Sequence, residues 1–168
     1  MTRAVACLAA LALSAAAGAL AAPAPHVQIT SLAQLPTPLP LPYDPVADAD
    51  AQVAAGKAKA AASGKLLLID LGGNWCGDCR VLAGVMRQPE VAAFVEAHYV
   101  VVPVDVGRSN RNLQIPSRYG VKHLEGVPSL LVVDAHGRLL DAGHVNALAD
   151  ARSMTPQGLA DWLARWTN

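Results

Sequence analysis

The chain has 168 residues, 53% of them hydrophobic, and its 13 Lys and Arg balance its 13 Asp and Glu. This length fits one ordinary domain with short appendages and excludes two full hydrophobic cores. A balanced charge without a basic or acidic run excludes a nucleic-acid-binding surface and an acidic tail, so no nucleic-acid partner is expected.

The first residues have the pattern of an export signal. Arg3 precedes an Ala/Leu-rich apolar stretch at 4–18, and residues 19–21 supply the small-x-small pattern of a cleavage site. We therefore expect residues 1–21 to be a signal peptide and the mature protein to be periplasmic. The alternative is an uncleaved signal that anchors the protein to the inner membrane, because the apolar stretch approaches a spanning length.

Residues 22–47 are rich in proline, which nearly alternates with Leu and Thr as far as Pro45. Such a segment cannot form a helix or a central strand. We expect either an extended tether or an arm that lies on the domain. The side chains that could pack there are Leu39, Leu41 and Tyr43.

The remaining residues, 48–168, are expected to form one domain. Apolar runs predict strands at 65–71, 99–106, 129–133 and 138–142. Helices are predicted from Asp48 or Asp50 to Gly64, from the cysteines to Met86, at 90–97, around 117–119 and at 155–166. The last two strands would be joined by a hairpin turn at 134–137. This order predicts an α/β fold with a central mixed β-sheet and helices on both faces.

Two cysteines, Cys76 and Cys79, stand where the strand at 65–71 gives way to a helix. A sulfur at a helix N-terminus faces unpaired backbone N–H groups and the positive end of the helix dipole, which favour the thiolate. The pair is therefore interpreted as a redox-active dithiol. Cys76 would be the exposed nucleophile and Cys79, one turn deeper, the resolving thiol; two inert buried cysteines are the alternative.

The cysteine count argues against structural roles for this pair. Removal of the signal also removes Cys7, and closing so short a loop as 76–79 would restrict the unfolded chain very little. A structural zinc site usually needs four ligands, and the five histidines are scattered singly. We therefore expect no metal and no organic cofactor.

The charges next to the dithiol act in opposite senses. Asp78 opposes a thiolate on Cys76, whereas Arg80 favours it. The sequence leaves open which effect dominates, although the adjacent carboxylate favours a more reducing couple. Asp78 could equally be a favourable residue in the first helical turn.

These residues resemble the thioredoxin superfamily, and in particular its exported members with a Cys-Gly-Asp-Cys active site. Trp75 precedes the dithiol, Asp70 stands six residues before Cys76, and Gly126-Val127-Pro128-Ser129 leads into an apolar strand, as in that superfamily's cis-proline loop. The resemblance covers residues 48–166. It implies a thioredoxin fold.

The resemblance also implies roles for single residues. Asp70 would be the buried acid that accepts the proton of Cys79, the alternative being a surface carboxylate at the strand end. Trp75 would shield the dithiol and contact the substrate. Val127 would present its backbone to an extended substrate segment, and Pro128 would be a cis-proline that faces the cysteines.

The expected function is that of a thiol–disulfide oxidoreductase that reduces disulfides of exported proteins or peptides through a mixed disulfide. We expect a monomer that receives electrons from a partner redox protein. An oxidase is less favoured, and so is an isomerase, because no dimerisation domain is visible. The alternative is a non-catalytic binding or chaperone module of thioredoxin fold that uses the groove at Pro128.

Overall fold

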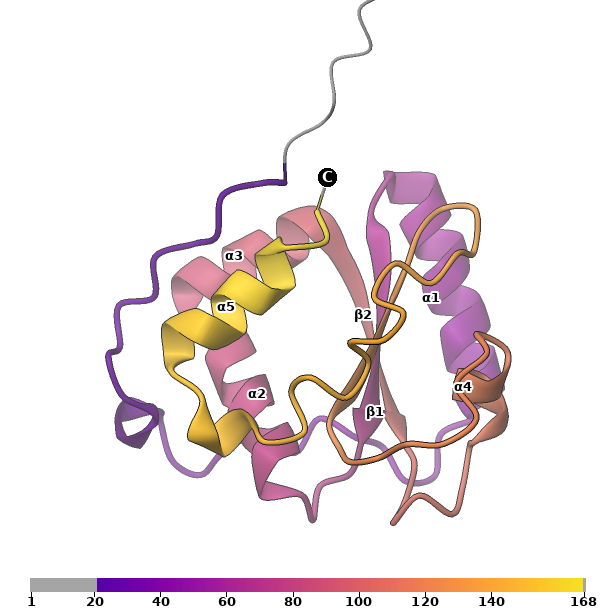
Figure 1. The fold of residues 1–168 in the computed structure, drawn as a ribbon, viewed down its shortest axis with the longest axis horizontal. Helices are drawn as coiled ribbons and strands as arrows, with labels where there is room; N and C mark the ends of the chain where they lie inside the picture. The colour runs from indigo at the N-terminus through magenta and orange to yellow at the C-terminus, as the bar shows by residue number, and fades with distance from the viewer. Residues whose placement is uncertain (1–20, 168) are drawn as a thin grey trace, which may run out of the picture.

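A three-stranded mixed sheet with helices on both faces forms the centre of the computed structural model, which describes residues 21–167 (Figure 1). The predicted α/β fold class is therefore confirmed. Residues 1–20, which hold most of the predicted signal peptide, lie outside the described residues. In chain order the elements are η1 (Leu32–Gln34), α1 (Ala49–Ser63), β1 (Leu66–Gly72), α2 (Gly77–Met86), α3 (Pro89–His98), β2 (Tyr99–Asp105), α4 (Gln114–Ser117), β3 (Ser129–Val133), η2 (Ala151–Ser153) and α5 (Pro156–Ala164).

The sheet has the strand order β2-β1-β3, so β1 lies at its centre. β1 pairs in parallel with β2, where Leu66 is opposite Tyr99, and antiparallel with β3, where Asp70 is opposite Leu130. Central strands are covered on both faces, which explains the continuous apolar run of β1. β2 has no second strand partner in the described residues, and this edge position tolerates Pro103, which has no N–H to donate.

Alternate side chains of β1 point into two hydrophobic clusters, one on each face of the single sheet. Leu68 packs on one face with residues of α2, α3 and α5, and Ile69 packs on the other with residues of α1 and with Ile115 of α4. Figure 1 shows these two groups of helices on opposite sides of the sheet. Because side chains alternate along a strand, Asp70 shares the face of Leu68 and points towards α2.

The helix ends carry the capping residues that the sequence predicts. Asp48 accepts the N–H of Ala51 at the start of α1, and Gly64 ends that helix in a left-handed conformation. Thr155 caps α5 by accepting the N–H of Gly158. Two predicted helices differ from the structure by more than one residue: α5 ends at Ala164, two residues early, and the helical turn predicted around 117–119 forms at Gln114–Ser117.

The strand predicted at 138–142 is wrong. The turn at 134–137 does form, but beyond it Leu139 makes only an isolated bridge to Val133. The reason is Asp141, whose buried carboxylate accepts the N–H of Val132 at 3.0 Å. A side chain thus occupies the backbone donor that a regular partner strand would use.

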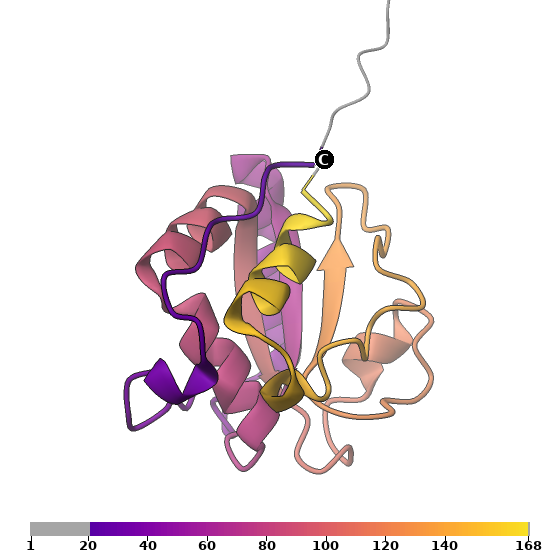
Figure 2. The same cartoon turned by 60° about the vertical axis from the view of Figure 1, so that its left-hand side comes forward.

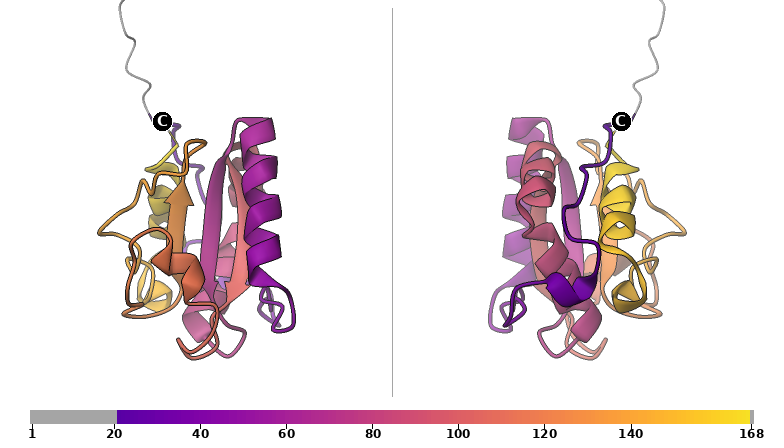
Figure 3. Two further views of the ribbon diagram at one scale, coloured as in Figure 1. Left: turned by 90° about the vertical axis from the view of Figure 1, so that its right-hand side faces the viewer. Right: turned by 90° about the vertical axis from the view of Figure 1, so that its left-hand side faces the viewer.

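The proline-rich arm, which we define as residues 22–47, lies against α5 and α3 in its first half (Figures 2 and 3). Gln157 of α5 accepts the N–H of Val27 at 2.9 Å and donates to the carbonyl of Pro25 at 3.0 Å. Glu90 of α3 accepts the N–H of Gln28 at 2.7 Å. These side chains supply the hydrogen bonds that an extended segment cannot make internally.

The second half of the arm crosses α2 and then leads to the start of α1. Arg80 of α2 donates to the carbonyl oxygens of Leu39 at 3.0 Å and of Pro40 at 3.3 Å. Of the three side chains singled out in the sequence, Tyr43 is buried, Leu39 is partly buried and Leu41 is 62% exposed. The arm is therefore part of the folded domain surface, and the side chain of Tyr43 reaches the interior.

No helix among residues 21–167 is both long enough and apolar enough to span a membrane.

Candidate active site

Cys76 forms the N-cap of α2, directly after the turn that follows β1. Its N–H donates to the carbonyl of Gly73 at 3.0 Å, and its sulfur accepts the N–H of Cys79 at 3.1 Å. The sulfur therefore meets the unpaired N–H groups of a helix start, as the sequence predicts. The same thiol donates to the carbonyl oxygen of Val127 at 3.3 Å.

Cys76 is less exposed than expected. Only 4% of its surface is accessible, because Val127 packs against the cysteine pair. Its accessible edge lies in the wall of a cavity of about 520 Å³, whose lining includes Trp75, Arg108 and Arg152. Access to the sulfur is therefore through this cavity.

The loop at Val127-Pro128 lies beside Cys76 because of the sheet pairing. β3 is antiparallel to β1, so its first residue, Ser129, is opposite Leu71 near the end of β1. The loop before β3 and the turn after β1 consequently meet at one edge of the sheet. The peptide bond between Val127 and Pro128 is cis, as the resemblance implied.

Cys79 is fully buried one turn into α2. Burial raises the pKa of its thiol, and the neighbouring Cys76 and the charge of Asp70 act in the same direction. Both cysteines are in the free thiol form. The arrangement thus holds a protonated thiol directly behind the sulfur of Cys76.

Asp70 is fully buried, so the alternative of a surface carboxylate is wrong. Its Oδ1 accepts the hydroxyl of Tyr43 at 2.8 Å, and its Oδ2 has no hydrogen-bond partner among the described residues. Burial raises the pKa of Asp70 to about 7, against the lowering effect of the Tyr43 hydrogen bond. This carboxyl group can therefore take up or release a proton near neutral pH.

Trp75 is half-exposed and forms one wall of the cavity. Its indole N–H donates to the carbonyl of Gly107 at 2.9 Å, and the guanidinium of Arg108 lies 4.4 Å from the ring centroid. The ring is thus held by the loop after β2 and leaves apolar surface beside Cys76. This position fits a contact with substrate better than core packing.

From the sequence, Asp78 and Arg80 are expected to act in opposite senses on a thiolate at Cys76. In the structure each of the two charged side chains is engaged by another group. Asp78 is ion-paired with Arg152 at 3.0 Å, so its charge is compensated from the η2 segment. Arg80 instead holds the arm. Asp78 and Arg80, which flank Cys79 in the sequence, therefore each have a partner that is distant in the sequence.

Sequence reasoning did not assign Tyr43, Arg108 and Arg152 to the site. The sequence marks Tyr43 only as a side chain that could pack on the domain, and nothing near Arg108 or Arg152 in the sequence marks a functional role. Tyr43 and Arg108 lie in irregular segments and Arg152 lies in the short η2 helix, and no hydrophobic period in the sequence specifies where these segments run.

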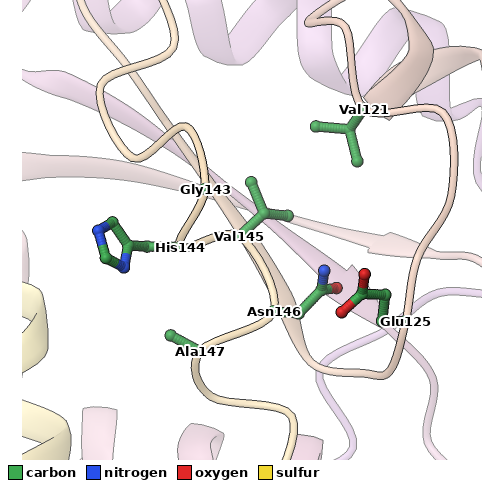
Figure 4. A pocket seen from close by; sticks show the side chains of 7 residues that line it. All are labelled: Val121, Glu125, Gly143, His144, Val145, Asn146 and Ala147. Carbon is green, nitrogen blue, oxygen red and sulfur yellow. The ribbon is translucent and has the colours of Figure 1, made fainter.

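A second cavity of about 400 Å³ adjoins the first, since Glu125 lines both. Figure 4 shows Glu125 and Asn146 at one end of it, while His144 points away from them. The Asn146 side chain is already engaged, because its Oδ1 accepts the hydroxyl of Ser129 at 2.6 Å. No group of three or more potential metal ligands occurs within residues 21–167.

Comparisons with known proteins agree with the fold described above and with the position of the two cysteines in it. Residues 48–135 match the model of a family described as thioredoxin-like, and this range includes Asp70, both cysteines and Pro128. Thioredoxin 1 of Nostoc sp. is 33% identical over 66 residues, which are 39% of this chain and about half (54%) of that relative. The solved structure of a disulphide isomerase from Xylella fastidiosa Temecula1 is 38% identical with a TM-score of 0.72, over 77% of this chain and 99% of that one.

Proposed function

This chain belongs to the thioredoxin-like family, which supports thiol–disulfide oxidoreductase chemistry in general, and we propose that it reduces disulfides of exported proteins through Cys76 and Cys79. The observation that carries the proposal is the position of the Cys76 sulfur. It caps a helix N-terminus, opens into a cavity, and has a buried protonated thiol behind it.

The proposed reaction begins at Cys76. Its thiolate attacks one sulfur of the substrate disulfide, and the other substrate sulfur leaves as a thiolate that takes up a proton. Cys79 then loses its proton and attacks the Cys76 sulfur of the mixed disulfide. The second substrate sulfur leaves with the electron pair, so the substrate gains two electrons and the protein becomes a disulfide.

The proposed direction, reduction of substrates, draws support from the surroundings of the sulfurs. In strongly oxidising thiol–disulfide oxidoreductases the reduced, dithiol form of the protein is stabilised. In the described residues the Cys76 sulfur contacts a backbone N–H and a carbonyl, and no cationic side chain hydrogen-bonds to it. The negative charge of Asp70 further disfavours a thiolate on Cys79. Asp78 adds little to this argument because Arg152 compensates its charge.

Substrate binding is proposed to use the cavity around Trp75. An extended segment of the substrate would pair with the backbone of Val127 and lay its disulfide beside Cys76. The lining of the cavity combines the apolar ring of Trp75 with two arginines, Arg108 and Arg152, and two acidic residues, Asp78 and Glu125. Such a mixed lining suits a segment of peptide.

Export to the periplasm is part of the proposal and has its own test. The protein would be expressed with its full N-terminus in a Gram-negative bacterium and recovered from the periplasmic fraction. An N-terminus beginning at Ala22 would support cleavage after Ala21, whereas the intact chain in the membrane fraction would favour an anchor.

The electrons that return the protein to its dithiol form would come from a partner redox protein.

Insulin reduction tests the activity. We expect the wild-type protein to accelerate it and Cys76→Ser to lose the acceleration. Cys79→Ser should accumulate a mixed disulfide with its substrates, which identifies them. Equal rates for wild type and Cys76→Ser would instead favour a non-catalytic binding module.

The equilibrium potential in a glutathione buffer tests the direction. A value on the order of −120 mV, at the oxidising end of the range, would contradict a reductase.

A further inference from the structure

The arm brings one polar group into the interior of the site, the hydroxyl of Tyr43. This side chain is buried, and its hydroxyl donates to Asp70 at 2.8 Å. Its backbone is held on both sides by Asn74, which accepts the Tyr43 N–H at 3.1 Å and donates to the Tyr43 carbonyl at 2.7 Å. Asn74 stands two residues before Cys76, so the ring is tied directly to the active-site turn.

The hydroxyl of Tyr43 and the sulfur of Cys79 both lie next to the backbone of Gly72. A Cβ placed on Gly72 would contact the Tyr43 hydroxyl and would lie 2.8 Å from the Cys79 sulfur. Glycine at this position therefore leaves the space between the two groups open. Tyr43 and Cys79 also form one apolar cluster with Cys76.

The Tyr43 hydroxyl is suited to pass a proton on and not to keep a charge. Burial raises its pKa, and the charges of Asp70 and Cys79 raise it further. It therefore remains neutral, with one O–H to donate and lone pairs to accept. Asp70 is the only acceptor of its hydrogen bond in the described residues.

We propose, on the basis of the oxidoreductase function above, that the Tyr43 hydroxyl relays the proton of Cys79 to Asp70 when the mixed disulfide is resolved. As the Cys79 S–H bond breaks, its proton passes to the Tyr43 oxygen, and the original Tyr43 proton passes to the Asp70 carboxylate. The Cys79 thiolate forms a bond to the Cys76 sulfur, and the bond between Cys76 and the substrate breaks. The substrate sulfur leaves with that electron pair, and Tyr43 ends neutral.

The ionisation of Asp70 sets the pH dependence of this step. The titratable groups that face Asp70 are Tyr43 from the arm and Cys79 from α2. Its partners on the adjacent strands, Pro103 and Leu130, carry no charge. The carboxylate must be ionised to accept the proton, so resolution should accelerate as the pH rises through the pKa of Asp70, about 7.

The experiment separates attack from resolution. Reduced protein, in excess and concentrated enough to make attack the faster step, is mixed with the chromogenic disulfide dithiobis-nitrobenzoate. Attack by Cys76 releases a first thionitrobenzoate in a concentration-dependent phase, and resolution by Cys79 releases a second in a concentration-independent phase. The variant is Tyr43→Phe. The matched control is Tyr99→Phe, which removes another buried hydroxyl, one that donates to the carbonyl of Leu163.

We expect Tyr43→Phe to slow the second phase on the order of tenfold to a hundredfold and to leave the first unchanged, because only resolution needs the transfer. The pH midpoint of the second phase should also move upward, since the Tyr43 hydrogen bond lowers the pKa of Asp70. Tyr99→Phe should change neither.

Three results would overturn the relay: an unchanged second phase, an equal slowing of both phases, or a slower second phase with an unmoved midpoint. A wild-type protein that releases only one thionitrobenzoate would instead contradict the oxidoreductase function itself. Thermal unfolding of both variants accompanies the kinetics, so that a folding defect is identified.

Discussion

The carboxylate of Asp78 and Arg152 form a two-point contact across 74 positions of sequence. The backbone N–H of Arg152 donates to Oδ1 at 2.9 Å, and its Nε donates to Oδ2 at 3.1 Å. Asp78 stands between the two cysteines, and Arg152 belongs to η2. This pair therefore places a cation next to the Cys76 end of α2 and compensates the carboxylate there.

Removing the cation of this pair should make Cys76 less reactive. In Arg152→Met the charge of Asp78 is uncompensated beside the sulfur, and the thiolate is disfavoured. We expect iodoacetamide labelling of Cys76 to slow by roughly twofold to fivefold, the range for an exposed charge pair. Arg138→Met, which removes an exposed ion pair with Asp134 beyond the other end of β3, is the control. Equal labelling of the two variants would show that Arg152 does not act on Cys76.

Replacing the buried carboxyl group should stabilise the protein in a pH-dependent way. The pKa of Asp70 is about 7 when folded and about 4 when unfolded. A raised carboxyl pKa means that the folded state binds the proton more tightly than the unfolded state. The buried carboxyl group therefore lowers the free energy of unfolding only slightly at acid pH and progressively more as the pH rises to 7. The full cost is on the order of 4 kcal/mol above that range.

In Asp70→Asn this cost is absent, although the new amide N–H₂ group needs a partner. We expect the gain in unfolding free energy to be about 2–3 kcal/mol larger near pH 8 than near pH 5. Denaturant unfolding of both proteins at the two pH values measures it. An equal gain at the two pH values would mean that the pKa of Asp70 is the same in the folded and unfolded states.

Shortening Trp75 should weaken substrate binding more than chemistry. The ring is half-exposed and forms a wall of the cavity. Loss of about 1–2 kcal/mol of contact in Trp75→Ala would raise KM for protein disulfides about 5–30-fold with a smaller change in kcat. The rate with dithiobis-nitrobenzoate, which has no peptide segment to bind beside the ring, should change little. A fall in kcat alone would point to a role in the reaction step.

Releasing the arm from α2 should expose its second half. Arg80→Met removes both hydrogen bonds to the carbonyls of Leu39 and Pro40. We expect faster amide exchange and faster proteolysis between residues 31 and 47, while the sheet stays protected. Arg87→Met, at the C-cap of the same helix, is the matched control. Unchanged exchange in Arg80→Met would show that apolar packing alone holds the arm.

A methyl group on Gly72 should disrupt the site. It would press on Tyr43 and lie 2.8 Å from the Cys79 sulfur, and neither group has free space to move into. We expect Gly72→Ala to cost about 1–3 kcal/mol of stability. In Gly84→Ala the nearest atoms are the ends of the Leu35 and Leu39 side chains, both at 3.3 Å, and these flexible ends can shift, so the change should be close to neutral. Thermal unfolding of the pair measures the difference.

The fold class and the dithiol could be predicted from the sequence because each depends on local order, whereas the loop at Val127-Pro128 was expected only from the resemblance to the thioredoxin superfamily. A continuous apolar run indicates a central strand, and two cysteines after it indicate a helix start. The strand predicted at 138–142 was wrong for a non-local reason. The pattern of its apolar residues does not show that the Asp141 side chain takes the N–H of Val132.

By itself the sequence determined which sulfur caps the helix, since the N-cap position and the spacing of two residues are properties of one short segment. Only the tertiary structure decided what surrounds the two sulfurs. Tyr43 reaches Asp70 across 27 positions, and Arg152 reaches Asp78 across 74. Such contacts come from the path of irregular segments over the sheet, and that path depends on packing and single side-chain hydrogen bonds that have no period in the sequence.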